Sequence, residues 1–297
     1  MRVLLFGNTR KAKVKDTIKE LETWLKRRAE TVTYELAEET KGPFSGDVAI
    51  ALGGDGTFLR VSRHISPYGI PILGVHLGTF GFLSELTQAD MYLHMEKVLK
   101  GQYRLTNRIL LRCKLVRKGE VVMDVLGVND VVISRASLSR LISIKLFIGD
   151  EAVTTYSCDG IVVSTPLGST AHCLAAGGPI LAPEMDALII SPICPHTLTN
   201  RPLVISGDSK IGMEPSTEGV EMGLTVDGQV YEDLLNGDRI RVERADVRLR
   251  IVDTGIRSFY EVLREKLAWG GSPRYGQGYY SCGALQGMRT LHPLLSA

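Results

Sequence analysis

The sequence predicts an α/β protein in which a doubly wound N-terminal domain precedes a mainly β, two-sheet C-terminal domain. Three observations predict this fold class. Short apolar runs alternate with helix-spaced apolar residues before Asn107, and a glycine-rich turn, residues 53–57, directly follows one of these runs. From Asn107 to about Asp253, segments of alternating apolar and polar residues end at turn pairs.

The N-terminal part shows the alternation of strands and helices that is typical of a parallel sheet. Helical spacing of apolar residues predicts a helix over 14–25, a second helix from Phe58, and a third over 91–99. Continuous apolar runs predict the strands Val3 to Phe6, Val48 to Leu52, and Ile70 to Leu77. We therefore expect residues 1–105 to form the doubly wound domain.

The middle of the chain has the pattern of an antiparallel β domain, which we place at residues 106–255. Its strand-like runs are rich in β-branched residues and include residues 109–116, 142–148, 188–193 and 247–252. The turn pairs between them are Lys118-Gly119, Gly149-Asp150, Asp227-Gly228 and Asn236-Gly237-Asp238.

The C-terminal region contains one more predicted helix. Ser258 and Glu261 have the spacing of a capping box, and Phe259, Val262 and Leu263 give the following helix an apolar face. We expect this helix to pack on the first domain, so that residues 256–275 complete it. Residues 276–297 are rich in glycine and lack periodicity, which indicates a C-terminal tail.

The sequence Gly53-Gly54-Asp55-Gly56-Thr57 is the strongest local signal for chemistry. A glycine turn between a buried strand and a helix is typical of loops that bind phosphate, because backbone N–H groups at a helix start attract anions. An ionised aspartate there would repel a phosphate, so its presence needs another reason, and orienting or activating the hydroxyl that attacks the phosphate is one such reason. The alternative is an ordinary tight turn. No Lys-Ser or Lys-Thr pair follows, which excludes a Walker A loop.

Composition excludes several other classes of function. The net charge of +2 is too small to indicate nucleic acid or an acidic membrane as a partner, and no apolar run is long enough for a membrane span. The 5 cysteines are dispersed, and the 6 histidines lack metal-ligand spacing, which argues against a disulfide framework and a structural zinc site. No signal peptide is recognisable, so we expect a cytoplasmic protein.

Two further segments carry polar groups in unusual density. Residues 159–181, DGIVVSTPLGSTAHCLAAGGPIL, combine hydroxyls, small residues and glycines, as a crevice for a polar ligand requires. A small-residue helix start packed on a sheet is the alternative. Asn129-Asp130 precedes an apolar run and either binds ribose hydroxyls and a carboxamide or forms a turn.

With these three segments in this order, the chain resembles the NAD kinases, which use ATP to phosphorylate the 2′-hydroxyl of the adenosine ribose of NAD. The motif GGDGT alone is shared with diacylglycerol and sphingosine kinases and, in a shorter form, with phosphofructokinases. Residues 159–181 and the following PICPHTLTNRPLVI, residues 192–205, are more specific. The resemblance extends from the first strand to Gly271.

The resemblance implies a site in a crevice between the two domains. It implies ATP and NAD as substrates, Mg²⁺ or another divalent cation carried with ATP, and a homo-oligomer, either a dimer or a tetramer. Asp55 would be the catalytic residue that accepts the proton of the hydroxyl, and the loop residues Gly53, Gly54, Gly56 and Thr57 would face the ATP phosphates. The other residues implied in NAD binding are Gly56, Arg60, Asn129, Asp130, Arg140, Ser157, Asp159, Thr170, Ala171, His172, Cys173, Leu174, Ala175, Cys194 and Gln229.

The sequence departs from the family pattern at three positions. Asp130 replaces the usual glutamate, His172 the usual tyrosine, and His76 the usual asparagine. Ser157 occupies a position linked to the choice between NAD and NADH and leaves that choice open, and ATP and polyphosphate both stay open as the phosphoryl donor. A lipid kinase with the GGDGT motif and a non-catalytic dinucleotide sensor are the alternative functions.

Overall fold

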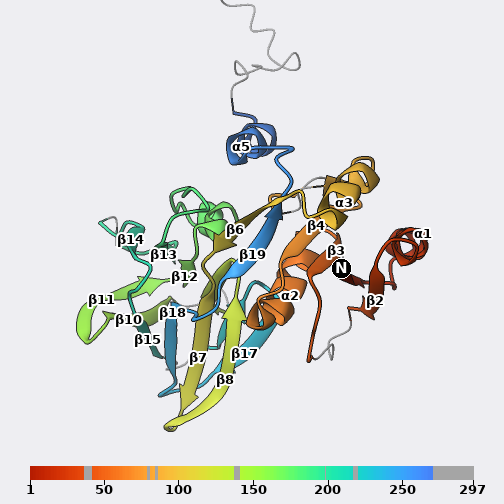
Figure 1. Ribbon diagram of the computed structural model, residues 1–297. Helices are drawn as coiled ribbons and strands as arrows, with labels where there is room; N and C mark the ends of the chain where they lie inside the picture. The colour runs from red at the N-terminus through yellow and green to blue at the C-terminus, as the bar shows by residue number, and fades with distance from the viewer. Residues whose placement is uncertain are drawn as a thin grey trace, which may run out of the picture. The chain divides into compact units, whose positions relative to one another are not determined.

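The computed structural model describes residues 1–36, 42–78, 81–83, 86–136, 141–197, 199–216 and 220–269. Its N-terminal part contains a 7-stranded sheet with the strand order β2-β1-β3-β4-β19-β6, in which β5 also pairs with β4. β1 to β4 are parallel, whereas β6 is antiparallel to β19 (Figure 1). The strands are β1 (Arg2–Gly7), β2 (Glu30–Glu35), β3 (Val48–Gly53), β4 (Ile72–His76), β5 (Leu86–Thr87), β6 (Arg104–Arg108) and β19 (Leu249–Asp253).

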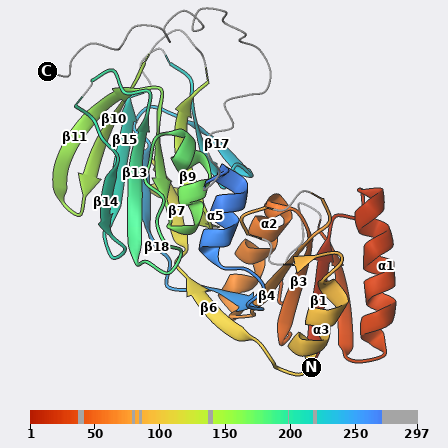
Figure 2. The ribbon, with the colours of Figure 1, turned by 90° about the horizontal axis from the view of Figure 1, so that it is seen from above.

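Helices cover both faces of this sheet, because alternate strand residues point to opposite sides. The side of Val3 and Leu5 packs against α1 (Ala12–Lys26) and α3 (Met91–Leu99). The side of Leu4 and Phe6 packs against α2 (Asp55–Ile65), which is followed by the short helix η1 (Ser66–Tyr68). α1 is the red helix at the right of Figure 2. The predicted doubly wound α/β domain is thus confirmed.

Residues 111–244 contribute two 6-stranded antiparallel sheets that share one hydrophobic core. The first sheet contains β7 (Leu111–Arg117), β8 (Glu120–Gly127), β10 (Ile142–Ile148), β11 (Glu151–Cys158), β15 (Ile211–Ser216) and β18 (Arg239–Arg244). The second contains β9 (Asp130–Arg135), β12 (Gly160–Ser164), β13 (Ala187–Ile193), β14 (Leu203–Ser206), β16 (Met222–Val226) and β17 (Val230–Leu234). This arrangement confirms the predicted two-sheet β architecture.

The other face of the second sheet is covered by the segment that follows β12. This segment forms η2 (Leu167–Thr170) and α4 (His172–Ala175), and it buries Cys173 and Leu181 against Val132, Val162 and Ile189. Since β12 pairs with β9 and β13, the segment is anchored at the centre of the sheet.

Two strands of the α/β sheet lie where the sequence predicts β-domain residues. β6 begins at Arg104 and ends at Arg108, and β19 contains most of the run 247–252, which the sequence assigns to the β domain. β19 instead pairs with β4 and with β6 in the 7-stranded sheet. The predicted domain limits, 1–105 and 106–255, stay predictions.

The chain divides into two compact units, residues 1–257 and the part from Ser258 onward. The described residues of the second unit contain α5 (Phe259–Leu267), and its predicted capping box is confirmed. The Ser258 amide donates to Glu261 Oε2 at 2.6 Å, and the Glu261 amide donates to Ser258 Oγ at 3.2 Å. Packing of α5 on the first domain stays a prediction, and the predicted tail 276–297 lies outside the described residues.

Among the residues that the structure describes, no helix is both long and apolar enough to cross a membrane.

Candidate functional site

The glycine turn places Asp55 in the first turn of α2. The helix starts at Asp55, three residues before the predicted start at Phe58, because the amides of Thr57 and Phe58 both donate to the Gly54 carbonyl. Gly53 is the glycine that the turn requires, since its φ is 156° and a Cβ there would lie 2.3 Å from Thr57 Oγ1.

The Asp55 carboxylate is held in one orientation by a second loop. Its Oδ2 accepts the Phe82 amide at 2.9 Å, and its Oδ1 accepts the Leu83 amide at 3.3 Å. A Cβ at Gly81 would lie 1.9 Å from Asp55 Oδ1, so only glycine allows this approach. An ionised carboxylate has about four acceptor positions, so two remain for a substrate hydroxyl.

Asp227 binds the segment that contains the predicted Asn129-Asp130 pair. Its buried carboxylate accepts the amides of Val128 at 3.0 Å, Asn129 at 2.7 Å and Asp130 at 3.2 Å. Asp227 and Gly228 have φ values of 52° and 62°, which turn the chain between β16 and β17 and bring the carboxylate to these amides. The turn pair seen in the sequence thus fixes the start of β9.

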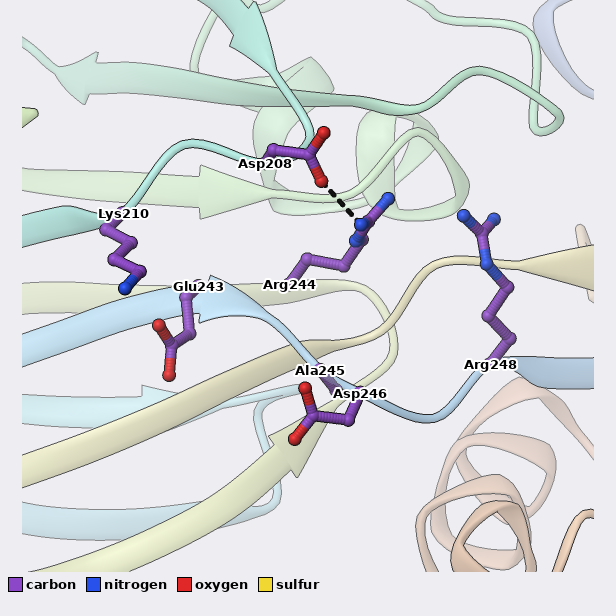
Figure 3. Close-up of a pocket in the computed structure, with 7 residues that line it drawn as sticks. All are labelled: Asp208, Lys210, Glu243, Arg244, Ala245, Asp246 and Arg248. Atoms are coloured by element: carbon purple, nitrogen blue, oxygen red, sulfur yellow. Dashed lines mark ion pairs between the residues drawn. The ribbon is translucent and has the colours of Figure 1, made fainter. Parts of the chain in front are cut away.

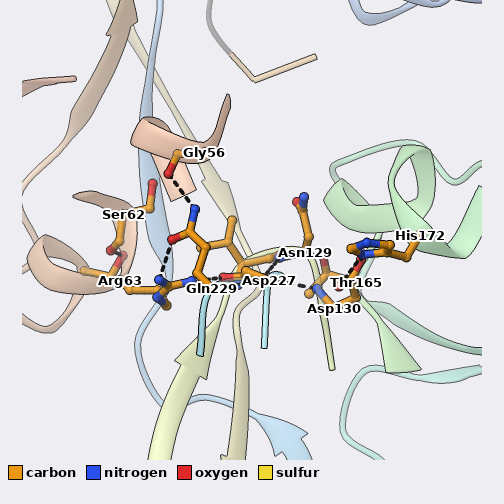
Figure 4. Close-up of polar contacts among 11 residues, drawn as sticks. Gly56, Ser62, Arg63, Asn129, Asp130, Thr165, His172, Asp227 and Gln229 are labelled. Carbon is orange, nitrogen blue, oxygen red and sulfur yellow. Dashed lines mark hydrogen bonds and ion pairs between the residues drawn. The ribbon is translucent and has the colours of Figure 1, made fainter. Parts of the chain in front are cut away.

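Gln229 and Arg63 connect this turn to α2 (Figure 4). Gln229 Nε2 donates to the Gly56 carbonyl at 2.7 Å, and Gln229 Oε1 accepts from Arg63 Nη2 at 2.6 Å. Arg63 Nη1 forms an ion pair with Asp227 Oδ2 at 2.7 Å. The start of the Asp55 helix and the Asn129 segment are therefore joined by a short series of polar contacts.

The second signature segment packs against the same place on β9. Thr165 is fully buried, its amide donates to the Asn129 carbonyl at 2.9 Å, and its hydroxyl donates to the Val128 carbonyl at 2.7 Å. A Cβ at Gly168 would lie 2.1 Å from the Asn129 carbonyl oxygen. The absence of side-chain bulk in this segment thus allows η2 to approach β9 closely.

Asn129 offers an acceptor without a partner. Its side-chain Oδ1 is buried and accepts no hydrogen bond from any of the described residues. A buried amide oxygen without a donor is costly, because it has lost its hydration. The atom is therefore suited to a hydroxyl or amide donor supplied by a ligand.

His172 and Asp130 contact each other. His172 Nδ1 lies 3.1 Å from Asp130 Oδ1. Asp130 is fully buried, whereas 59% of the His172 side chain is exposed. The hydrogen bond to Asp130 raises the pKa of His172 above its ordinary value, and partial burial opposes this shift. Two of the departures from the family pattern therefore form one pair.

The remaining predicted residues lie in several places. Arg60 is half-buried on α2, Ser157 is exposed on β11, and Asp159, between β11 and β12, pairs with Arg135 at 2.9 Å. Arg140 lies outside the described residues. Those on or next to the second segment and β13 are Thr170 at the end of η2, Ala171 before α4, Cys173, Leu174 and Ala175 on α4, and the exposed Cys194 after β13.

Cys173 contributes packing to the site. It is buried, and burial raises the pKa of its thiol to about 11, so the thiol stays protonated near neutral pH. A Cβ on Gly178 would lie 2.3 Å from Cys173 Sγ, so the tight turn after α4 requires a glycine beside this cysteine.

Sequence reasoning missed five residues that shape the site: Arg63, Gly81, Thr165, Gly168 and Asp227, the last of which was predicted only as a turn residue. Arg63 lies two helical turns after Gly56 on α2, so the helix period would place the two on one face. Thr165 and Gly168 stood within the second signature segment without assigned roles. No local signal connects Gly81 with Asp55, because their contact is tertiary.

A charged cavity of about 510 Å³ lies elsewhere, beside the end of β18 (Figure 3). Its arginines already have acidic partners, with Arg244 at 2.5 Å from Asp208 and Arg248 at 2.9 Å from Asp186. The residues that line it are Asp208, Lys210, Glu243, Arg244, Ala245, Asp246 and Arg248, and they include none of the predicted site residues.

Within the described part of the chain, no group of three or more histidine, cysteine, aspartate or glutamate side chains is arranged to hold a metal ion. Asp55 is the one carboxylate in the turn 53–57, and its two bonds to amides orient it.

Comparison with known families identifies both parts of the chain. Residues 36–103 match the ATP-NAD kinase N-terminal domain, and residues 128–254 match the ATP-NAD kinase C-terminal domain. The first match contains the Asp55 turn, and the second contains Asn129, Asp227 and the signature segment.

Curated relatives match over most of their length. The NAD kinase of Geobacter metallireducens is 38% identical over 281 residues, which are 91% of this chain and 99% of that protein. The NAD kinase of Geotalea daltonii is 44% identical over 228 residues, which are 77% of this chain and 80% of that protein.

Solved structures share the fold. A crystal structure of yeast NADH kinase complexed with NADH superposes with a TM-score of 0.82 at 24% identity, covering 93% of this chain and 90% of that one. The crystal structure of an NAD kinase from Archaeoglobus fulgidus in complex with ATP superposes with a TM-score of 0.73 at 22% identity. The match covers 90% of this chain and 99% of that one. Together with the domain matches and the curated relatives, the site geometry leads to one conclusion: this chain belongs to the NAD kinase family.

Proposed function

We propose that this protein transfers the γ-phosphoryl group of ATP to the 2′-hydroxyl of the adenosine ribose of NAD, and that Asp55 receives the hydroxyl proton. The observation that carries the proposal is the hydrogen bond of 2.7 Å between Gln229 Nε2 and the Gly56 carbonyl. It joins the helix start that carries Asp55 to the turn that fixes Asn129. A hydroxyl held near Asn129 and a phosphate held at the glycine turn would then face one carboxylate.

In the proposed reaction, the 2′-oxygen forms a bond to the γ-phosphorus while the bond from that phosphorus to the β–γ bridging oxygen breaks. The hydroxyl proton passes to Asp55, and ADP leaves with the bridging oxygen. Because the transition state of phosphoryl transfer is loose, positioning of the hydroxyl is expected to be the main contribution of the protein. The amides of Phe82 and Leu83 support this role by fixing the Asp55 carboxylate.

The glycine turn is proposed to bind the ATP phosphates through its backbone amides. Helix starts attract anions, and the amides of Asp55 and Gly56 lie in the first turn of α2. A divalent cation such as Mg²⁺ is proposed to arrive bound to ATP, where it would neutralise phosphate charge.

NAD is proposed to bind along the Asn129 segment and the second signature segment. The unpartnered Asn129 Oδ1 supports a contact with a ribose hydroxyl or the carboxamide group. His172, which presents a flat and largely exposed ring beside Asp130, would contact the dinucleotide. Arg60, Arg140, Ser157, Asp159, Cys194 and the residues from Thr170 to Ala175 are proposed to line the rest of the site.

The complexes of the two solved relatives support a nucleotide as the phosphoryl donor and a dinucleotide as the acceptor. The yeast protein was crystallised with NADH and the archaeal one with ATP. We propose ATP as the donor, and Ser157 on the exposed face of β11 as the position to vary when NAD and NADH are compared.

The function is tested by incubating the protein with Mg²⁺ and one donor, ATP or polyphosphate, together with NAD, NADH or diacylglycerol. We expect NADP or NADPH from the dinucleotides and no lipid phosphate. A product made from diacylglycerol and none from either dinucleotide would contradict the proposal. Dinucleotide binding by calorimetry without any turnover would instead identify a sensor.

We also propose that the protein forms a homo-oligomer, either a dimer or a tetramer, as its family resemblance implies. Light scattering coupled to size-exclusion chromatography measures the mass of the assembly directly, and a monomer at enzyme-assay concentrations would contradict it.

A further inference from the structure

Arg63 lies in the middle of α2 and connects two different partners. Its Nη1 pairs with Asp227 Oδ2 at 2.7 Å, and its Nη2 donates to Gln229 Oε1 at 2.6 Å. The Arg63 side chain is 12% exposed and that of Asp227 is 0% exposed, so both charges are largely removed from water. A planar guanidinium with fixed N–H directions can hold two acceptors in one geometry, which an ammonium group cannot do.

The partner carboxylate controls a segment of the proposed NAD site. Asp227 accepts the three successive amides of Val128, Asn129 and Asp130, at 3.0, 2.7 and 3.2 Å. These hydrogen bonds fix the backbone of Asn129, and thereby the position from which its side chain extends. Any displacement of Asp227 would therefore displace Asn129 and Asp130 together.

The second partner completes a closed ring of contacts. Gln229 accepts from Arg63 and donates to Gly56, and Gly56 and Arg63 are linked by two turns of α2 (Figure 4). Gly56 directly follows Asp55. The ring therefore fixes the distance between the start of α2 and the Asp227 turn, and through that turn the Asn129 segment.

We propose that Arg63 is a positioning residue for phosphoryl transfer, which sets the Asn129 segment against the helix start that carries Asp55 without touching either substrate. The inference rests on the proposed function. Since effective catalysis requires reacting groups to be placed within about 1 Å, loss of this ring is expected to reduce turnover and NAD affinity more than it reduces folding stability.

The chain contains a matched control in Arg117 on β7. Arg117 also binds a fully buried aspartate, Asp238, with Nε and Nη2 at 3.0 and 2.8 Å from its two oxygens. Asp238 in turn accepts the Leu235 amide at 2.8 Å. This second arginine thus has the same structural task, but the described residues that bind the Asp238 side chain, Arg117 and Leu235, do not belong to the proposed site.

The experiment compares Arg63→Met, Arg63→Lys and Arg117→Met with the unmodified protein. For each, kcat and KM for NAD are measured at saturating ATP, NAD affinity is measured by calorimetry, and the melting temperature is recorded. We expect Arg63→Met to lower kcat/KM at least about tenfold, with kcat itself reduced. Arg117→Met is expected to lower the melting temperature comparably and to leave kcat/KM within about twofold.

Arg63→Lys keeps the charge beside Asp227 and loses one of the two contacts, so its kcat/KM should lie between those of the unmodified protein and Arg63→Met. If Arg63→Met does not fold, Arg63→Lys decides the question by the same comparison with Arg117→Met. Equal effects of the Arg63 and Arg117 variants on kcat/KM, or no effect of either Arg63 variant, would overturn the proposal. An unmodified protein that binds NAD without forming NADP would instead overturn the proposed function, and the calorimetric comparison would still test positioning.

Discussion

At the residue scale, Asp55 depends on the absence of a side chain at Gly81. A methyl group at this position would lie 1.9 Å from Asp55 Oδ1 and 2.4 Å from its Cγ, so the carboxylate would have to rotate away. We expect Gly81→Ala to lower kcat about 10-fold to 100-fold and to leave the fold intact, because only a side chain must move. Steady-state kinetics measures this loss.

Gly78→Ala is the control, because a Cβ at Gly78 meets no atom of the described residues within 4 Å. A Gly81→Ala variant with the kcat of Gly78→Ala would show that the orientation of Asp55 does not limit the reaction.

The pair of His172 and Asp130 predicts a pH-dependent contribution to stability. Its hydrogen bond to Asp130 raises the pKa of His172 in the folded protein, so pairing stabilises the fold most at pH below the unfolded value of about 6.5. This contribution disappears as the pH rises through the raised folded value. We expect His172→Gln to lower the urea midpoint near pH 5.5 more than near pH 9. An equal change at both pH values would contradict the assignment.

Single residues show what the sequence could and could not predict. Asp55, Asn129 and the 159–181 segment stand out by type and position, because glycines, amides and carboxylates at strand ends carry a local signal. Asp227-Gly228 was predicted as a turn, and both residues do turn the chain with positive φ. That the Asp227 carboxylate binds three amides of a distant strand has no local signal, since the partner is far away in sequence.

At the scale of elements, η2 packs so closely against the start of β9 that the contact leaves no room for a side chain at Gly168. A Cβ at Gly168 would fall 2.1 Å from the Asn129 carbonyl oxygen, which is backbone and cannot rotate away. We expect Gly168→Ala to separate η2 from β9, with a lower melting temperature and at least about tenfold weaker NAD binding.

Calorimetry and thermal unfolding measure the two effects of Gly168→Ala. Gly212→Ala on β15 is the control, since its Cβ would meet Phe147 at an ordinary 3.4 Å. Unchanged NAD affinity in Gly168→Ala would mean that this approach does not shape the site.

Most elements followed from periodicity. α1, α3, β3 and the Ser258 capping box lie where the sequence predicts them, because each has a clear apolar period or cap. β2 is not predicted, since Glu30–Glu35 show no apolar run, and the strand has exposed ends and only half-buried residues between them. α2 starts earlier than Phe58, because Asp55 and Gly56 adopt helical geometry after a turn that is confined to Gly53 and Gly54.

At the scale of the whole chain, periodicity predicts the type of a strand but not its partner. The run 247–252 looks like its neighbours in the β domain, yet Ile251 pairs with Ile72 and Thr106 in the 7-stranded sheet. All strands offer the same backbone donors and acceptors, so pairing is decided by packing between distant residues. The same reason explains why the sequence identified the segments of the site, while their contacts through Arg63 and Asp227 required the structure.

The central claim is that Asp55, held at the start of α2, acts on a hydroxyl of NAD that is bound independently of it. The most direct measurement is NADP formation by Asp55→Asn, together with calorimetric NAD binding, and with Asp150→Asn on the exposed β10–β11 turn as the control. We predict that Asp55→Asn loses at least about 100-fold in kcat while its NAD affinity stays within a few-fold, and that Asp150→Asn matches the unmodified protein. Near-normal turnover in Asp55→Asn would contradict the account.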